Sequence, residues 1–252
     1  MNTFTRASVA LPLLACAGLV AGATAPHQPV FRLSNFAAPL VIDNPYSPMQ
    51  PGTRTVLYEL EDGECHVNDV VVTHAVKHDF QGCYAGLAAR AVRDRVWADD
   101  ACDGKRGLLL EDTIDWAAQD NGGNVWYLGE NTVEYQYDDS GHRISSSTEG
   151  SWEAGKRGAK AGILMYAHPV AGMYYLQEFE SGVAEDAALI EKVGIRVETG
   201  LGRFHDCVKT RETTALTPGD VEYKYYCRNL GVVRVVAPGA HGGAELVNFG
   251  LH

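Results

Sequence analysis

The sequence lacks the short motifs by which many enzymes and metal proteins are recognised. It has no G-x-S-x-G, H-E-x-x-H or S-x-x-K motif and no glycine-rich phosphate loop after a strand. It also has no C-x-x-C pair, which excludes zinc ribbons, thioredoxin-type redox sites and c-type haem. These absences remove several large functional classes, and we predict no cofactor.

Positive charge is scarce, with 21 lysines and arginines against 32 aspartates and glutamates and a net charge of -11. Such a chain repels phosphate groups, so we expect neither nucleic acid nor anionic lipid as a partner. An acidic surface suits cations, neutral sugars or apolar ligands. It is also a common means of keeping secreted proteins in solution, so charge alone does not choose a ligand.

Long hydrophobic runs are scarce too, and the one that stands out lies at the N-terminus. Arg6 precedes an apolar run over residues 7–20, which small residues follow. This is the plan of a secretory signal peptide over residues 1–25, too short for a membrane span. Because the residues around Cys16 resemble a lipobox, a lipid anchor there is the alternative. Both interpretations predict a secreted or periplasmic protein.

Five cysteines follow the signal peptide, and in an oxidising compartment they should pair. A hairpin with a Pro-Gly turn puts Cys207 nearly opposite Cys227, which makes them the first disulfide candidate. Cys65 and Cys102 could meet at one end of the strands between them. Cys83 would then remain unpaired.

The rest of the chain divides into a Pro-rich lead-in and a β-rich domain. Residues 26–52 show no sustained period, so we expect an extended lead-in, of which residues 26–44 pack little. From 53 to 252, short runs of β-branched and aromatic residues alternate with polar ones and are separated by turn residues. We predict one all-β domain, a mostly antiparallel barrel or half-barrel, and a monomer. Residues 150–172 read as a long Gly-rich crossing loop, and 183–193 as a helix or a strand.

Carboxylates and large aromatics crowd the hairpin over residues 111–130. In a strand, Glu111, Thr113 and Asp115 share one face, while Asp112 interrupts the apolar row on the other. One interpretation is an ordinary strand whose polar row faces solvent. The other is a concave site, because a half-buried carboxylate is costly unless it is paired or used.

Two sets of residues are candidates for chemistry at such a site. Glycoside hydrolysis uses paired carboxylates, and a loop histidine could serve as acid or base. The candidate catalytic residues are Glu111, Asp115, Glu130, His168 and Glu178. The candidate ligand-binding residues are Asp94, Trp116, Trp126, Tyr127, Trp152 and Tyr174.

The histidines offer a metal site as a further alternative. His66, His74 and His78 have the same parity, so an unbroken strand would place all three on one face. A bulge or turn is expected within so long a strand, and it would break that alignment. We therefore predict no metal site.

Two stretches carry a resemblance to a known group of proteins. One is VETGLGRFHDCVKTRETTALTPGDVEYKYYCRNLGVVRVV, and the other combines RDRVW, LLEDTIDWAAQDNGGNVWYLGE, GSWEAG and GIL. Together they resemble a family of secreted or lipoprotein-type bacterial β-rich proteins, over most of residues 45–236. The resemblance implies a β-rich fold and a location but no activity.

We therefore predict a small-ligand-binding, barrel-like protein whose partner is a small molecule or a glycan. Closed or curved secreted sheets commonly hold one ligand inside. The alternatives are a carbohydrate-active hydrolase or lyase using an acidic cleft, and a structural envelope protein without a small ligand.

Overall fold

The computed structural model describes residues 26–239 and 241–251, and this part of the chain is almost entirely β-structure. The signal peptide and the lipobox at Cys16 lie outside the described residues. Two short 3-10 helices occur, η1 (Leu33–Asn35) and η2 (Gly82–Tyr84). The strands are β1 (Thr53–Glu61), β2 (Glu64–Lys77), β3 (Ala89–Ala98), β4 (Leu109–Gln119), β5 (Val125–Tyr137), β6 (Arg143–Ser147), β7 (Trp152–Glu153), β8 (Lys160–Met165), β9 (Tyr174–Leu176), β10 (Glu178–Phe179), β11 (Asp186–Thr199), β12 (Gly202–Thr214), β13 (Val221–Cys227), β14 (Gly231–Val236) and β15 (Gly242–Leu251).

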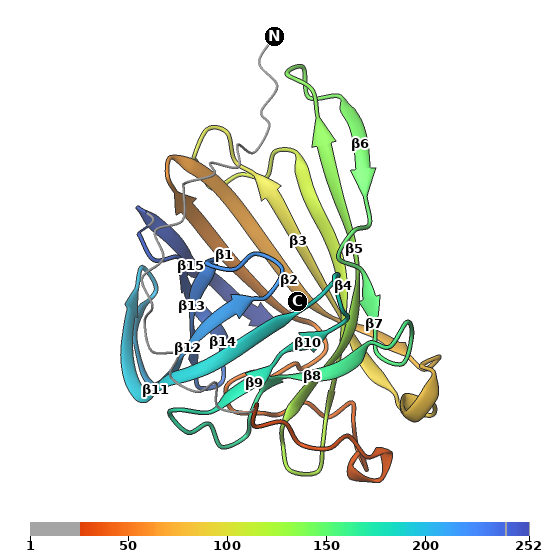
Figure 1. The fold of residues 1–252 in the computed structure, drawn as a ribbon. Helices are drawn as coiled ribbons and strands as arrows, with labels where there is room; N and C mark the ends of the chain where they lie inside the picture. The colour runs from red at the N-terminus through yellow and green to blue at the C-terminus, as the bar shows by residue number, and fades with distance from the viewer. Residues whose placement is uncertain (1–25, 240, 252) are drawn as a thin grey trace, which may run out of the picture.

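The strands form one antiparallel sheet that curls into a nearly closed barrel (Figure 1). Its order is β10-β8-β5-β4-β3-β2-β1-β15-β14-β13-β12-β11-β9, and β6 and β7 pair with β5 off this path. The two ends of the order, β9 and β10, are neighbours in the chain, separated by Gln177 alone. One short segment therefore pairs with β11 on one side and β8 on the other, and the all-β barrel prediction is confirmed.

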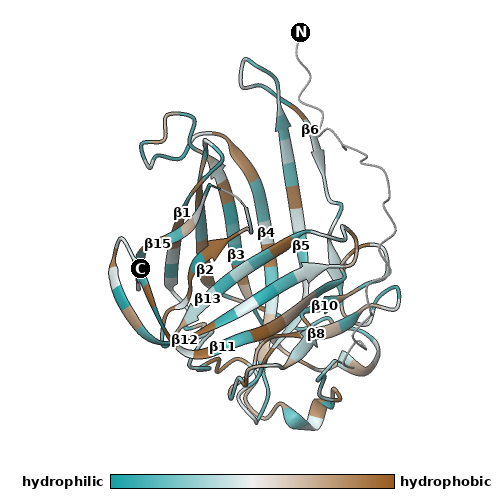
Figure 2. Cartoon of the chain, turned by 60° about the vertical axis from the view of Figure 1, so that its left-hand side comes forward, coloured by the Kyte–Doolittle hydropathy of each residue, from teal (hydrophilic) through white to brown (hydrophobic). Residues whose placement is uncertain are grey.

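Polar and apolar residues are interspersed along the strands, as Figure 2 shows. This is the period-two pattern that predicted strands from the sequence, and it gives each strand one face toward the interior and one away from it. In the described residues, no helix has the length and apolar character needed to cross a membrane.

Both predicted disulfides are present. Cys207 and Cys227 are direct partners across β12 and β13, with Cα atoms 4.2 Å apart, and Cys65 is bonded to Cys102. Cys83 is exposed and outside both bonds.

Removal of the Cys207–Cys227 bond should lower the free energy of unfolding. The bond closes a loop with a sequence separation of 20. Because cross-linking restricts the unfolded chain, we expect Cys207→Ala combined with Cys227→Ala to cost about 3 kcal/mol, measured by urea unfolding. The Cys83→Ala variant is the control. A double variant as stable as this control would contradict the expectation.

The expectation that residues 26–44 of the lead-in pack little is wrong. Phe36 and Tyr46 are buried in the main apolar cluster, and Ile42 is buried in a smaller one. The segment runs around the lower end of the barrel in the view of Figure 1. Prolines removed the periodic signal without removing the apolar side chains that anchor the segment.

Two smaller expectations are also resolved. The predicted crossing loop over residues 150–172 contains the short strands β7 and β8, so part of it belongs to the sheet and the rest remains loop. The stretch 183–193, ambiguous between helix and strand, falls mostly within β11.

Candidate ligand-binding site

The polar row of the acidic hairpin faces the inside of the barrel. Asp115 is the direct cross-strand partner of Glu130, and Thr113 is the partner of both Asp94 and Thr132. Cross-strand partners lie on the same face of a sheet, so these side chains line one continuous inner wall.

Asp112 points to the other face of β4, where Arg93 donates to it from Nε at 2.8 Å and also from its terminal nitrogen. This carboxylate, which the sequence marked as an anomaly, is thus paired outside the cavity.

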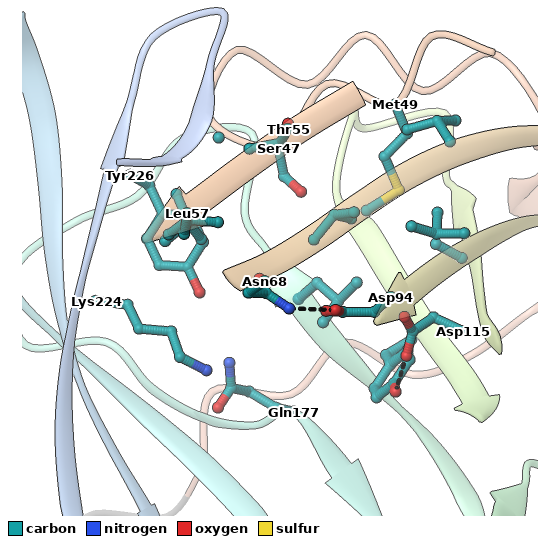
Figure 3. A pocket seen from close by; sticks show the side chains of 18 of the residues that line it. Ser47, Met49, Thr55, Leu57, Asn68, Asp94, Asp115, Gln177, Lys224 and Tyr226 are labelled. Atoms are coloured by element: carbon teal, nitrogen blue, oxygen red, sulfur yellow. Dashed lines mark hydrogen bonds between the residues drawn. The ribbon is translucent and has the colours of Figure 1, made fainter. Parts of the chain in front are cut away.

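The barrel interior holds a cavity of about 490 Å³. Ser47, Pro48 and Met49 of the lead-in contribute to its lining, as do Leu230 of the β13–β14 turn and Gly231 at the start of β14. Valines of β2, β3 and β14 supply apolar wall. The charged lining residues are Asp94, Asp115, Glu130, Glu178, Asp186, Glu212 and Lys224. Six carboxyl groups and one ammonium group therefore share this space, part of which Figure 3 shows.

Tyr127 joins two of the carboxyl groups. Its hydroxyl oxygen lies 2.6 Å from Asp115 Oδ1 and 2.9 Å from Glu130 Oε2. A hydroxyl has a single hydrogen and can donate to only one of them at a time. When both contacts are hydrogen bonds, one carboxyl group must carry a proton and donate to the tyrosine oxygen. The arrangement therefore holds a proton between the two acids.

Burial raises the pKa values of four cavity acids. Desolvation is the largest cause for each, and neighbouring carboxylates add to it. The pKa is about 7 for Asp94, Asp115 and Glu130, and about 8 for Glu178. Opposing hydrogen bonds come from Asn68 to Asp94 and from Trp152 Nε1 to Glu178, the latter at 2.8 Å. Near neutral pH these groups are thus divided between charged and neutral forms.

Lys224 is already paired within the cavity wall. Its Nζ lies 2.9 Å from Glu212 Oε2, and Thr210 and Tyr226 donate to Glu212 Oε1 at 2.8 and 3.0 Å. The charge of Glu212 raises the pKa of Lys224. Burial opposes ionisation of Glu212, but Lys224 and these hydrogen bonds hold its pKa below the usual value. The pair is ionic and leaves the other acids without a permanent counter-charge.

Breaking this pair should be costly. Lys224→Met keeps most of the side-chain volume but leaves Glu212 as an uncompensated buried charge, so we expect a loss of about 3 kcal/mol in urea unfolding at pH 7. The double variant with Glu212→Gln should recover much of that loss. If the double variant is less stable than Lys224→Met, the ionic account is wrong.

Gln177, the residue between β9 and β10, also lines the cavity. Its side chain is 7% exposed, and no described residue makes a hydrogen bond to its amide. Figure 3 shows it pointing into the same space as Lys224, with Asp94 and Asp115 beyond. Because the amide faces the cavity and has no partner among the described residues, a ligand or water in the cavity can satisfy it.

Five of the sequence candidates come together at this cavity, namely Asp94, Asp115, Tyr127, Glu130 and Glu178. Two more lie next to the cavity-lining residues. Glu111 shares the inner face and accepts from Thr113 Oγ1 at 2.7 Å, and the buried Trp152 packs edge-on against Tyr127.

The remaining candidates do not line the cavity. Trp116 packs against Phe80 and Lys77, and Trp126 packs against lead-in phenylalanines. Tyr174 lies half-buried on β9, and its carbonyl accepts from the His27 amide. His168 is exposed after β8 and is not among the cavity-lining residues.

Sequence reasoning missed several cavity residues, namely Asn68, Gln177, Asp186, Glu212, Lys224 and Tyr226. A signal existed for two of them. The register that places Cys207 opposite Cys227 also places Thr210 opposite Lys224, with Glu212 two residues along the same face.

Metal ligation has little geometric basis in the described part of the chain, where no group of three or more His, Cys, Asp or Glu is arranged to hold an ion. The register between β2 and β3 is irregular between Val72 and Val76, where His74 lies, and β2 ends at Lys77, so His78 lies beyond the strand. His66 Nδ1 instead lies 3.0 Å from Glu59.

Comparisons with known proteins do not identify a family. No family model and no curated protein matches the chain. Among solved structures, the chain is similar to a crystal structure described as "a putative lipoprotein from Parabacteroides distasonis", with a TM-score of 0.42 and 13% sequence identity, covering 82% of this chain and 99% of that one. At this level of similarity the match supports no argument about function. An argument about function therefore rests on the geometry of the cavity.

Proposed function

We propose that the protein binds a small ligand inside its barrel, outside the cytoplasm. The observation that carries this proposal is the cavity of about 490 Å³ with polar side chains directed into it from both sides of the barrel. Such a volume falls in the range of small-molecule sites. The two disulfides support the location, because such bonds persist in oxidising compartments.

A carbohydrate-active hydrolase is the second candidate, and one observation favours it. Because Asp115 and Glu130 contact the same hydroxyl, their nearest oxygens are at most about 5.5 Å apart, a separation compatible with retaining glycosidases. Tyr127 stands between the two acids, however, and a sugar ring would have to displace it. Binding is therefore the better supported function.

A thermal-shift screen against sugars, fatty acids, organic amines and calcium tests the proposal, since a ligand of the folded state raises the melting temperature. Val70 lines the cavity, whereas Val71 points to the opposite face of the same strand. We expect at least one compound to stabilise the wild type and the Val71→Trp control but not Val70→Trp. Equal stabilisation of both variants, or none by any compound, would count against an interior site. Turnover of aryl glycosides that is lost in Glu130→Gln would favour the hydrolase instead.

A further inference from the structure

We infer, building on the proposed function, that the interior ligand is a small organic cation carrying amino or guanidino groups, held by the carboxylates of the barrel wall together with Gln177. The argument rests on the charges that face the cavity, on an unpartnered amide and on the space available.

When the cavity acids are ionised, the charges around the cavity do not balance. Acids enter from several elements, and the ammonium group among the described lining residues is already paired with Glu212. The titratable groups that face the shared interior are Asp94 of β3, Glu111 and Asp115 of β4, Tyr127 and Glu130 of β5, Glu178 of β10, Asp186 of β11, Glu212 of β12, and Lys224 and Tyr226 of β13. A bound cation supplies the missing positive charge.

Two lining groups have hydrogen-bonding capacity that the protein leaves unused. Gln177 is 7% exposed, its amide faces the cavity and makes no hydrogen bond with a described side chain or backbone group, and its oxygen can accept from an ammonium or guanidinium N–H. The half-buried carboxylate of Asp186 likewise accepts from no described donor. The amide of Gln177 supports a ligand independently of the acidic cluster. It is neutral, so its position in the cavity wall does not follow from the net charge of the site.

The dimensions favour an organic cation over a metal ion. Calcium takes six to eight oxygens at about 2.3–2.6 Å, which requires acids that converge on one point. Here the acids are distributed around a cavity of about 490 Å³, and no three of the described ones are placed to share an ion. A ligand with several N–H donors spread over a carbon framework can reach separate acids.

The Asp115–Tyr127–Glu130 arrangement adds a condition on pH. The two acids hold a proton between them, and a cation that pairs with both must displace it. Because the pKa values of these acids are about 7, the proton is present below neutral pH and absent above it. Cation binding should therefore strengthen as pH rises.

Isothermal titration calorimetry with 1,4-diaminobutane, spermidine and methylguanidine tests the inference, with 1,4-butanediol as the uncharged match of the first. We expect an amine to bind at pH 8.5 and the diol not to bind. Acidification to pH 6 should weaken binding on the order of tenfold for each carboxyl group that must lose its proton. Binding should release protons, measured by repeating the titration in buffers of different ionisation heat.

Three variants locate the site. Asp115→Asn and Gln177→Leu should each weaken amine binding by about tenfold or more. Asp112→Asn is the matched control, because Asp112 lies on the same strand but pairs with Arg93 on the outer face. It should bind like the wild type.

The outcomes separate this inference from the proposed function. If a sugar or a fatty acid binds, is lost in Val70→Trp, and no amine binds, the barrel is a binding protein and the cation inference is wrong. Tighter binding of calcium than of every amine would also overturn it, in favour of a metal site. If no probe binds, or if Val70→Trp binds as the wild type does, both the inference and the interior site fail.

Discussion

Replacing Phe36 with alanine should lower the free energy of unfolding by about 3–5 kcal/mol, the usual loss for a buried phenylalanine. The Phe36 ring is 8% exposed and lies 5.9 Å from the Trp126 ring and 5.2 Å from the Phe31 ring, measured between centroids. Its removal leaves a cavity in the main apolar cluster. Urea unfolding followed by tryptophan fluorescence measures the effect.

Val41 provides the control within the same segment. It is 59% exposed, so Val41→Ala should change the stability by less than about 0.5 kcal/mol. Deletion of residues 26–52 removes the Tyr46 anchor as well and should leave the chain without a cooperative unfolding transition. A deletion variant that melts within a few degrees of the wild type would show that the lead-in is dispensable.

Local rules were enough to predict the strands and the disulfides. Alternation of polar and apolar residues depends on near neighbours, and a hairpin register follows once its turn is located. The pair Cys207–Cys227 could therefore be predicted, and the same register contains the Thr210–Lys224 pairing that completes the site.

Long-range packing could not be predicted in this way. The side chain of Asn44 in the lead-in accepts from the backbone N–H groups of Tyr46 and Ser47. Its side-chain nitrogen donates to the Gly123 carbonyl, and its backbone N–H donates to the side chain of Gln119. The last two contacts span 79 and 75 residues of sequence. No periodic pattern in the local sequence predicts these two contacts. The closure of the sheet at Gln177 is equally non-local.

The candidate site was predicted in part for the same reason. Asp115 and Glu130 share a hairpin, so strand parity placed them together. Whether their common face meets solvent or a barrel interior depends on how the whole sheet curls, which parity alone does not determine. His168 was favoured because it lies beside a proline in a glycine-rich stretch, but β8 of this stretch ends at Met165 and the histidine beyond it is exposed.

The unliganded protein should become less stable as the pH rises from about 5 to 8. Asp94, Asp115, Glu130 and Glu178 have pKa values of about 7 to 8, raised first by burial, whereas carboxyl groups of unfolded chains titrate near 4. Between these limits the folded state binds more protons than the unfolded state, so the free energy of unfolding falls as pH increases. The stability that these four acids contribute through their raised pKa values is complete below about pH 4 and lost above about pH 8. Glu212, whose pKa is lowered, acts in the opposite direction at acid pH, so maximum stability is expected near pH 5.

Each extra proton held by the folded state contributes a slope of about 1.4 kcal/mol per pH unit. Asp115→Asn removes one of the two acids that hold a proton through Tyr127, so its stability curve should be flatter by about that amount between pH 5 and 7. The variant should therefore be no more stable than the wild type at pH 5 and clearly more stable at pH 8, because the desolvated charge is gone. Urea unfolding at half-unit pH steps measures both curves, and Asp112→Asn should run parallel to the wild type. A wild-type curve that rises from pH 5 to 8, or an Asp115→Asn curve parallel to it, would mean that the interior acids ionise freely, and the barrel wall would then already be fully charged at neutral pH without any ligand.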